Sequence, residues 1–218
     1  MKPFGDVAMF CATPMKKTDK KEVIMQNCQA GRSMLEMLGV LSIIGVLSIG
    51  GIAGYSKMMM QYKINTCMQQ INIMSSKLSA IGSQISSYGG LNNASAIKFN
   101  AVPAELVSGN SSLTNPFGGA VTISAAPLLS GSSEDSQAYT IKYSNLPEEA
   151  CLALASRDWN SSKSSTLLGV GVGDNIGASI YQGCTGDADV SCSGAMDISK
   201  ARAACNCGSS CIIVMKFF

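Results

Sequence analysis

The feature that most constrains this chain is an apolar run of 20 residues without a charged side chain, from Met37 to Ser56. An α-helix of that length rises about 30 Å, at about 1.5 Å per residue, which matches the hydrocarbon thickness of a bilayer. No other stretch of the sequence is comparably long and apolar. The run therefore predicts a single membrane-spanning helix.

Positive charge precedes the run and predicts its orientation. Residues 1–31 hold five lysines against three acidic residues, and an excess of lysine ahead of a span keeps the N-terminus in the cytoplasm. Small residues stand before the run, at Gln29-Ala30-Gly31, so a cut there would leave the hydrophobic helix in the mature chain. Met1 and Met15 are both plausible initiators, because each precedes a basic leader.

Composition excludes several classes of function. The chain has no histidine, which removes Ser-His-Asp and Cys-His catalysis and every zinc site that needs an imidazole. A net charge of +2 is too small for a protein held by phosphate contacts, so no nucleic-acid partner is expected. The glycine-rich stretch at residues 169–173 lacks the Lys-Ser/Thr of a P-loop. We expect no enzyme activity, cofactor or metal.

Glu36 is a carboxylate at the start of the apolar run. An acidic side chain within a membrane helix costs about 2.5–3.5 kcal/mol on insertion scales, and less near the interface. One interpretation is a side chain that reaches the membrane edge. The other is a pair with a cation of a neighbouring helix, such as an amino terminus created at Arg32. Such a pair would set the axial register of packed helices more than it adds net stability.

Gly31-Arg32-Ser33-Met34-Leu35-Glu36, followed by a glycine-studded apolar helix, resembles the N-terminus of a type IV pilin precursor. The long leader and the mature length, 218 − 31 = 187 residues, are similar to the type IVb subgroup, which includes bundle-forming, toxin-coregulated and conjugative thin-pilus pilins. The resemblance implies that prepilin peptidase cuts between Gly31 and Arg32, that the new amino terminus is methylated, and that Glu36 directs assembly. Arg32 departs from the apolar residue usual at that position.

The resemblance implies a structural subunit. It would be a single-pass inner-membrane protein that an assembly platform builds into an extracellular homopolymer for adhesion, aggregation or conjugation. The alternatives are a minor pilin or secretion-system pseudopilin and, more remotely, a membrane-anchored thiol redox protein. The implied parts are a leader (1–31), a membrane and filament-core half-helix (32–56), an amphipathic half-helix (57–90) and a globular head (91–218).

An apolar stripe continues beyond the membrane run. Its members recur at alternating spacings of three and four residues, which is typical of one helix face on a core: Ile64, Cys67, Ile71, Met74, Leu78, Ile81, Ile85 and Tyr88. We therefore predict a helix from about Ser33 to Tyr88 that ends at Gly89-Gly90.

The remainder predicts an α+β head, in which the long helix packs on an antiparallel β-sheet with disulfides. β-prone segments bounded by turn signals are Ala120–Ser124, Ala138–Tyr143, Leu167–Val172 and Cys211–Phe217. Short helices are expected at residues 147–155 and 197–204.

Seven cysteines remain if Cys11 and Cys28 leave with the leader, and Cys67 lies on the apolar stripe as a core thiol. The other six allow 15 pairings. The segments Asn115–Gly119, Ala150–Leu154 and Ala204-Cys205 resemble the head of bundle-forming-type pilins, which implies a Cys151–Cys205 disulfide. Loop proximity suggests Cys184–Cys192 and Cys207–Cys211. A thiolate metal or redox centre at Cys205, Cys207 and Cys211 is the alternative.

Overall fold

The computed structural model describes residues 29–218 except 86, 129–135, 160–165, 175–189 and 193–194, with the side chains of residues 29–33 and 190–192 also left aside. The chain divides into two compact units, residues 1–54 and 55–218, which we call the N-terminal unit and the head unit. Helix α1 (Gln29–Gly82) begins in the first unit and ends in the second.

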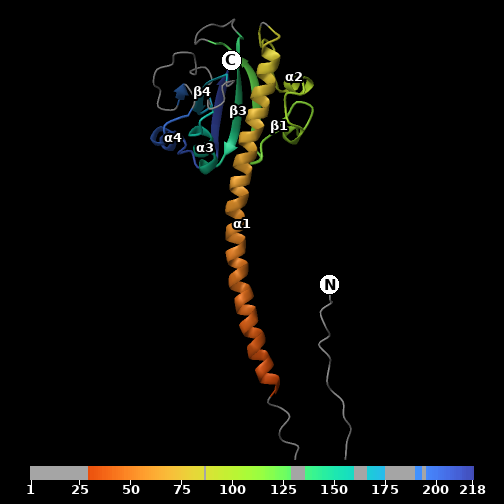
Figure 1. The fold of residues 1–218 in the computed structure, drawn as a ribbon, viewed down its shortest axis with the longest axis vertical. Coiled ribbons are helices and arrows are strands. Elements are labelled where there is room, and N and C mark those ends of the chain that lie inside the picture. Colours follow the sequence, from red (N-terminus) through yellow and green to blue (C-terminus); the bar gives the residue numbers. More distant parts are fainter. Residues whose placement is uncertain (1–28, 86, 129–135, 160–165, 175–189, 193–194) are drawn as a thin grey trace, which may run out of the picture. The chain divides into compact units, whose positions relative to one another are not determined.

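The head unit contains one antiparallel sheet, with six strands among the described residues. Along the sheet the strands are ordered β1-β2-β3-β6-β4-β5, so β6, the last in sequence, lies between β3 and β4. The expected antiparallel α+β fold is confirmed (Figure 1). The strands are β1 (Leu113–Thr114), β2 (Ala120–Ala126), β3 (Ala138–Leu146), β4 (Leu167–Val172), β5 (Val190–Cys192) and β6 (Cys211–Phe217).

Short helices flank the sheet and the C-terminal half of α1 in the head unit. In Figure 1, α2 lies on one side of this half of α1, and α3 and α4 lie on the other. A capping box between Asn92 and Ser95 starts α2, and Asp197 caps α4 by accepting a hydrogen bond from the Ser199 amide. The elements are α2 (Asn93–Lys98), the 3-10 helix η1 (Ala104–Leu106), α3 (Glu148–Ala155) and α4 (Ile198–Ala204).

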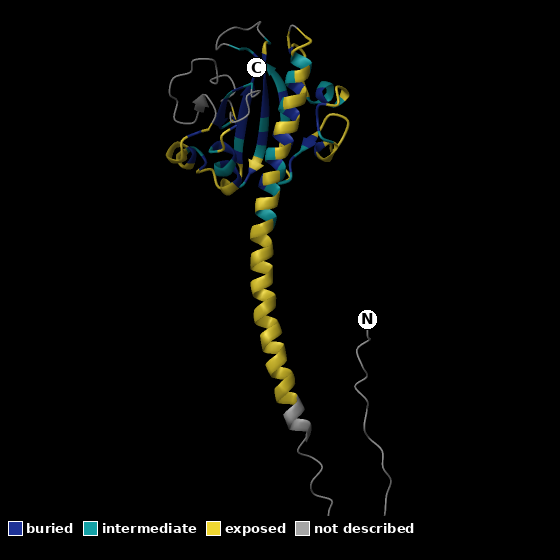
Figure 2. Ribbon diagram, viewed as in Figure 1, coloured by how far each residue is buried: buried dark blue, intermediate teal, exposed yellow. Residues whose placement is uncertain are grey.

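One face of the sheet packs on the apolar stripe of α1. Five members of the predicted stripe are at most 2% exposed: Ile64, Cys67, Ile71, Met74 and Leu78. They join a single core with alternate residues of β3 and β6, such as Ile141 and its cross-strand partner Met215. Figure 2 shows this core as the dark blue part of the head unit. The stripe therefore faces a core, as its spacing predicts.

The predicted end of the long helix is wrong: α1 ends at Gly82, six residues before Tyr88. The chain reverses there, so that Tyr88 packs back on the helix it was expected to extend. Its ring lies 4.9 Å from that of Tyr139, and its hydroxyl donates to the Leu78 carbonyl at 3.4 Å. A Cβ at position 82 would overlap the Tyr88 ring, so glycine is needed at this close approach. Ile85, also assigned to the stripe, is 44% exposed.

The turn between β1 and β2 is built around a buried asparagine. Asn115 Oδ1 accepts from the amides of Phe117 and Gly119 at 2.9 and 3.0 Å, while its Nδ2 donates to the Ser144 carbonyl at 2.8 Å. Gly118 has φ of 85°, a left-handed conformation that glycine adopts without strain. The Asn-Pro-Phe-Gly-Gly turn is thus held against β3 by the hydrogen bond from Asn115 to Ser144.

Candidate functional site

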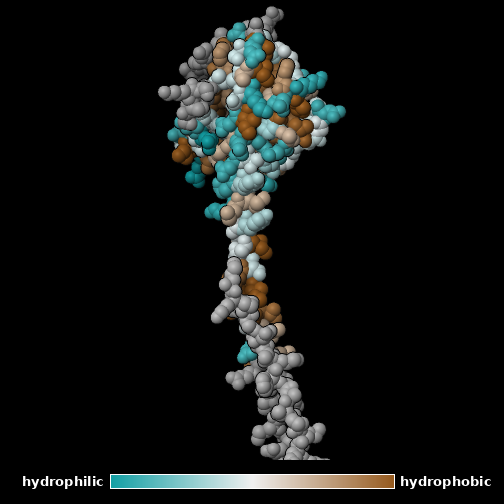
Figure 3. All heavy atoms as spheres, turned by 45° about the vertical axis from the view of Figure 1, so that its right-hand side comes forward, coloured by the Kyte–Doolittle hydropathy of each residue, from teal (hydrophilic) through white to brown (hydrophobic). Residues whose placement is uncertain are grey.

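The N-terminal unit presents an apolar helix without partners from the same chain. From Met34 to Ile52 its large apolar side chains are between 52% and 73% exposed, and they lie on every face of the helix. In Figure 2 this part of α1 is exposed throughout, and Figure 3 shows apolar side chains at its surface. A helix that is apolar all round belongs inside a membrane or a helix bundle. Among the described residues, it is the one helix long and apolar enough to cross a membrane.

The hydroxyl groups of Ser42 and Ser48 in this segment are satisfied within the helix. Ser42 Oγ donates to the carbonyls of Leu38 and Gly39 at 2.7 and 2.9 Å, and Ser48 Oγ donates to that of Ile44 at 2.7 Å. These hydroxyls need no water as a partner, so they can enter a hydrocarbon environment at little cost.

Glu36 is the one acidic residue within this apolar stretch. It is exposed, and no ion pair or hydrogen bond joins it to any residue that the structure describes. Val40 stands four positions after Glu36, whereas Arg32, whose side chain is not among those described, stands four positions before it. Gly31 and Arg32 lie within the first turn of α1, whose helical backbone begins at Gln29. The helix therefore places the predicted cleavage site and Glu36 within two turns of each other.

Five glycines leave open space along the same segment. No described atom lies within 4 Å of a Cβ built at Gly39, Gly45, Gly50, Gly51 or Gly54. Contacts within the described chain therefore do not explain the absence of side chains there. Small residues at such positions let the backbones of neighbouring helices approach closely.

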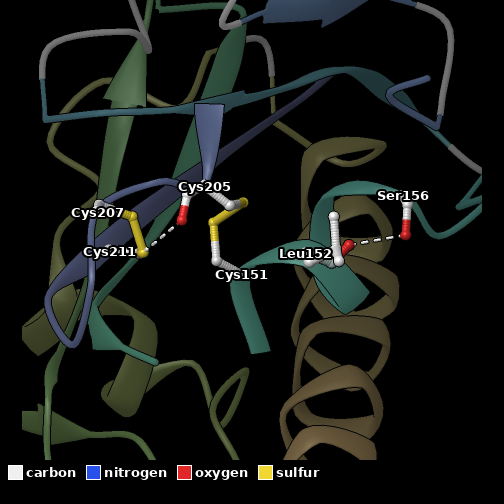
Figure 4. The surroundings of a disulfide bond; sticks show 6 residues. All are labelled: Cys151, Leu152, Ser156, Cys205, Cys207 and Cys211. Carbon is white, nitrogen blue, oxygen red and sulfur yellow. Dashed lines mark hydrogen bonds between the residues drawn. A yellow bond between two sulfur atoms is a disulfide. The ribbon is translucent and has the colours of Figure 1, made fainter. Parts of the chain in front are cut away.

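Among the described residues, the head unit holds two disulfides that lie side by side (Figure 4). Cys151 of α3 is bonded to Cys205, the C-cap residue of α4, with Cα atoms 5.8 Å apart. Cys207 is bonded to Cys211, the first residue of β6, with Cα atoms 5.2 Å apart. The first bond is the pair implied by the pilin resemblance, and the second is the pair suggested by loop proximity.

The remaining cysteine expectations have different outcomes. Cys184 lies outside the described residues, so the Cys184–Cys192 pair stays a prediction. Cys205, Cys207 and Cys211 all take part in disulfides, and a disulfide sulfur is not a thiolate ligand. These three cysteines therefore offer no free thiolate for a metal or redox centre in this structure.

Cys67 is a free thiol buried in the core, at 0% exposure. Burial raises its pKa to about 12, because the apolar surroundings disfavour the thiolate. It is therefore an inert packing residue of the α1 stripe, as the sequence predicts.

Two contacts join α1 to α3 and to the segment that directly follows α3 in the head unit. Gln61 Nε2 donates to Glu149 Oε1 at 3.0 Å, and Arg157 Nη1 lies 3.0 Å from Met68 Sδ. The Arg157 guanidinium also lies 5.5 Å from the centre of the Trp159 ring. These contacts were not predicted, because residue spacing along the chain does not show which helix faces another.

Lys216 is another residue that the sequence analysis missed. It lies on β6 and is 0% exposed, and no residue that the structure describes accepts a hydrogen bond from its Nζ. Burial lowers its pKa from the usual value. A lysine inside the apolar sequence of this strand was the available signal.

Known proteins resemble this chain in sequence and in fold. The profile of the family described as PilS N terminal matches residues 61–216, which is well over half of the chain. This chain belongs to the PilS family of type IVb pilins. As a PilS-family pilin it is a structural subunit of a pilus, and the family and its fold are structural rather than enzymatic.

Solved structures also resemble this chain. TcpA, a type IV pilin from Vibrio cholerae El Tor biotype, is 17% identical with a TM-score of 0.50, covering 72% of this chain and 99% of TcpA; this likeness concerns the fold alone. A type IVb pilin from Salmonella typhi is 17% identical with a TM-score of 0.45, covering 67% of this chain and 96% of that one. No curated protein matches the sequence.

Proposed function

We propose that this PilS-family pilin is made as a precursor and anchored in the inner membrane by residues 32–56, with its N-terminus in the cytoplasm. Prepilin peptidase removes residues 1–31 by cutting between Gly31 and Arg32. An assembly platform then builds the mature chain into an extracellular homopolymer for adhesion, aggregation or conjugation. Residues 57–90 and the head at 91–218 form the outer part of that fibre, stapled by Cys151–Cys205, Cys207–Cys211 and Cys184–Cys192.

In this proposal Glu36 accepts the amino terminus of an adjacent subunit. The supporting observation is an exposed carboxylate within an apolar helix that has no ion-pair partner among the described side chains. A charge transferred alone into an apolar bundle is costly, so a counter-ion supplied by a neighbour favours assembly and fixes axial register. The cleaved chain supplies that cation as the α-amine of Arg32.

The test separates cleavage from assembly. Glu36→Gln preserves shape but removes charge, and Ser42→Ala is the matched control, because its hydroxyl bonds only within its own helix. We expect both variants to be cleaved, as measured by the mass of the membrane form. Sheared surface fibres should fall at least about tenfold for Glu36→Gln, the equivalent of losing about 1.4 kcal/mol, and remain normal for Ser42→Ala. Wild-type fibre yield from Glu36→Gln would refute the role of the charge.

Mass spectrometry of the exported wild-type protein tests the processing step. We expect a chain that starts at Arg32 with a methylated amino terminus. A chain that starts elsewhere would overturn the assignment of Gly31 as the scissile residue. The amount in the sheared fraction separates the main fibre subunit from a minor pilin or pseudopilin, since the main subunit dominates that fraction.

A further inference from the structure

Four cysteines of the head unit converge in one place. The Sγ atoms of Cys151, Cys207 and Cys211 all lie within 4.8 Å of one another, and Cys205 is bonded to Cys151. The Cys211 Sγ also lies 3.6 Å from the Cys205 carbonyl oxygen. The sulfurs of the Cys207–Cys211 disulfide thus lie next to the Cys151–Cys205 disulfide (Figure 4).

The backbone holds these sulfurs together from several elements. Cys211 pairs with Leu146, which directly precedes the turn into α3. The Glu148 amide, at the start of α3, donates to the Gly208 carbonyl at 3.1 Å. The loop between Cys207 and Cys211 is therefore fixed against the N-terminus of the helix that carries Cys151. The proximity is a property of the fold and not of one side-chain rotamer.

Access to the cluster is uneven. Cys151, Cys205 and Cys211 are each 0% exposed, whereas Cys207 is not buried. The residues between Cys207 and Cys211 are exposed as well. A thiol from outside therefore reaches Cys207 before any other cysteine of the cluster. Attack on Cys207 leaves the new thiolate on Cys211, at the sulfur that contacts Cys151.

We propose that Cys151, Cys205, Cys207 and Cys211 form one thiol–disulfide exchange site, entered at Cys207 by a thiol-disulfide oxidoreductase or a small thiol. The entering thiolate bonds to Cys207 and breaks Cys207–Cys211, which frees the Cys211 thiolate. Cys211 then bonds to Cys151 and breaks Cys151–Cys205, which frees the Cys205 thiolate. Finally Cys205 bonds to Cys207 and expels the entering thiolate.

The cycle has no net oxidation or reduction. Two disulfides are present before and after it, and the entering thiolate is regenerated. It interconverts the observed pairing with the isomer Cys151–Cys211 and Cys205–Cys207. Cys205 and Cys207 are the nearest of these cysteines in sequence, with one residue between them. The exchange site lets a head that closed this pair first reach the observed pairing without reduction of both bonds.

The test uses the full chain in detergent micelles. Cys207→Ala leaves the Cys211 thiol free beside an intact Cys151–Cys205 disulfide. After incubation, acid quenching, unfolding and labelling with a maleimide, peptide mapping should find label on Cys205 as well as on Cys211. The exchange rate should rise by about tenfold per pH unit below the pKa of the thiol, because the thiolate is the attacking species. It should not depend on protein concentration.

The matched control is Cys207→Ala/Cys211→Ala, which keeps Cys151–Cys205 but has no attacking thiol in the cluster. Cys205 should stay unlabelled in that variant. Wild-type protein provides a second arm in case Cys207→Ala does not fold: limiting glutathione should produce molecules labelled on Cys205. Label confined to Cys207 and Cys211 in the wild type, or a Cys205 signal that scales with protein concentration, would overturn the proposal.

Discussion

The Cys151–Cys205 disulfide should stabilise the head far more than its neighbour, because it closes a much longer loop. The bonded residues are 54 positions apart, against four for Cys207 and Cys211. In the chain-entropy description, a cross-link removes freedom from the unfolded chain in proportion to the logarithm of loop length. The two loops then correspond to about 4 and about 2 kcal/mol of unfolding free energy at 25 °C.

Two double variants test this difference: Cys151→Ala/Cys205→Ala and Cys207→Ala/Cys211→Ala. Guanidinium unfolding of the full chain in detergent can be followed through Trp159, the only tryptophan of the sequence. Trp159 is 8% exposed, and its Nε1 donates to the Leu154 carbonyl of α3 at 2.9 Å. Its fluorescence therefore reports the part of the head that the disulfides hold.

We expect a loss of about 4 kcal/mol for the first variant and about 2 kcal/mol for the second. Wild-type protein unfolded under reducing conditions should lose at least about the sum of the two, because reduction also opens the proposed Cys184–Cys192 bond. Equal losses, or a larger loss from opening the short loop, would refute the argument from loop length. Such a result would indicate that packing around Cys211 at the start of β6 determines the stability.

Three further predictions concern the core. Asn115→Ala should cost about 2–4 kcal/mol by the same unfolding assay, because the buried Gly119 amide, the half-buried Phe117 amide and the Ser144 carbonyl lose their partner. Asn115→Asp should destabilise as well, because its second carboxylate oxygen would face the Ser144 carbonyl in a buried site. Gly82→Ala should cost about 1–3 kcal/mol because its Cβ overlaps the Tyr88 ring. In a Tyr88→Ala background the same change should be neutral or stabilising, and an equal cost in both backgrounds would contradict the contact. Cys67 binds its proton more tightly when folded, with a pKa raised from 9.0 to about 12. Its contribution to stability is therefore complete below pH 9 and is lost as pH rises above it, by about 1.4 kcal/mol per pH unit, so the stability difference between wild type and Cys67→Ala should shrink over that range.

Helices and strands are predicted well where one local sequence signal, such as a turn residue or a regular apolar spacing, determines them without competition from tertiary packing. The bounds of β4 and β6 match the predicted segments Leu167–Val172 and Cys211–Phe217, since glycine and turn residues bound both. The helix α3 follows Pro147, which favours a helix start. Burial of the α1 stripe up to Leu78 follows from spacing alone.

The end of α1 was mispredicted because tertiary packing interrupts a pattern that continues in sequence. Ile85 and Tyr88 keep the helical spacing, yet Tyr88 packs against the Tyr139 ring, tilted by 56°, after the chain reverses. The serine-rich sequence after Gly82 was the available local signal. Serine has a low helix propensity, but this small effect sets the end of a helix only where tertiary packing also draws the same residues out of the helix.

The candidate site was predictable in its parts and not in its arrangement. An apolar run and its carboxylate are visible in sequence, and so is each cysteine. The approach of Cys211 to Cys151 depends on how β6 enters the sheet beside α3. The burial of Lys216 depends on the same strand. The sequence separation of two residues says little about whether the sheet brings them together, as it does Cys211 and Cys151.

The central place of β6 has a consequence for biogenesis. A chain that lacks residues 211–217 retains β1-β2-β3 and β4-β5 as two ribbons, each with an unpaired inner edge where β6 would pair. Open edges of this kind aggregate or attract proteases. The sheet of the head cannot close until residues 211–217 have emerged from the ribosome, so only chains that contain β6 become stable pilus subunits.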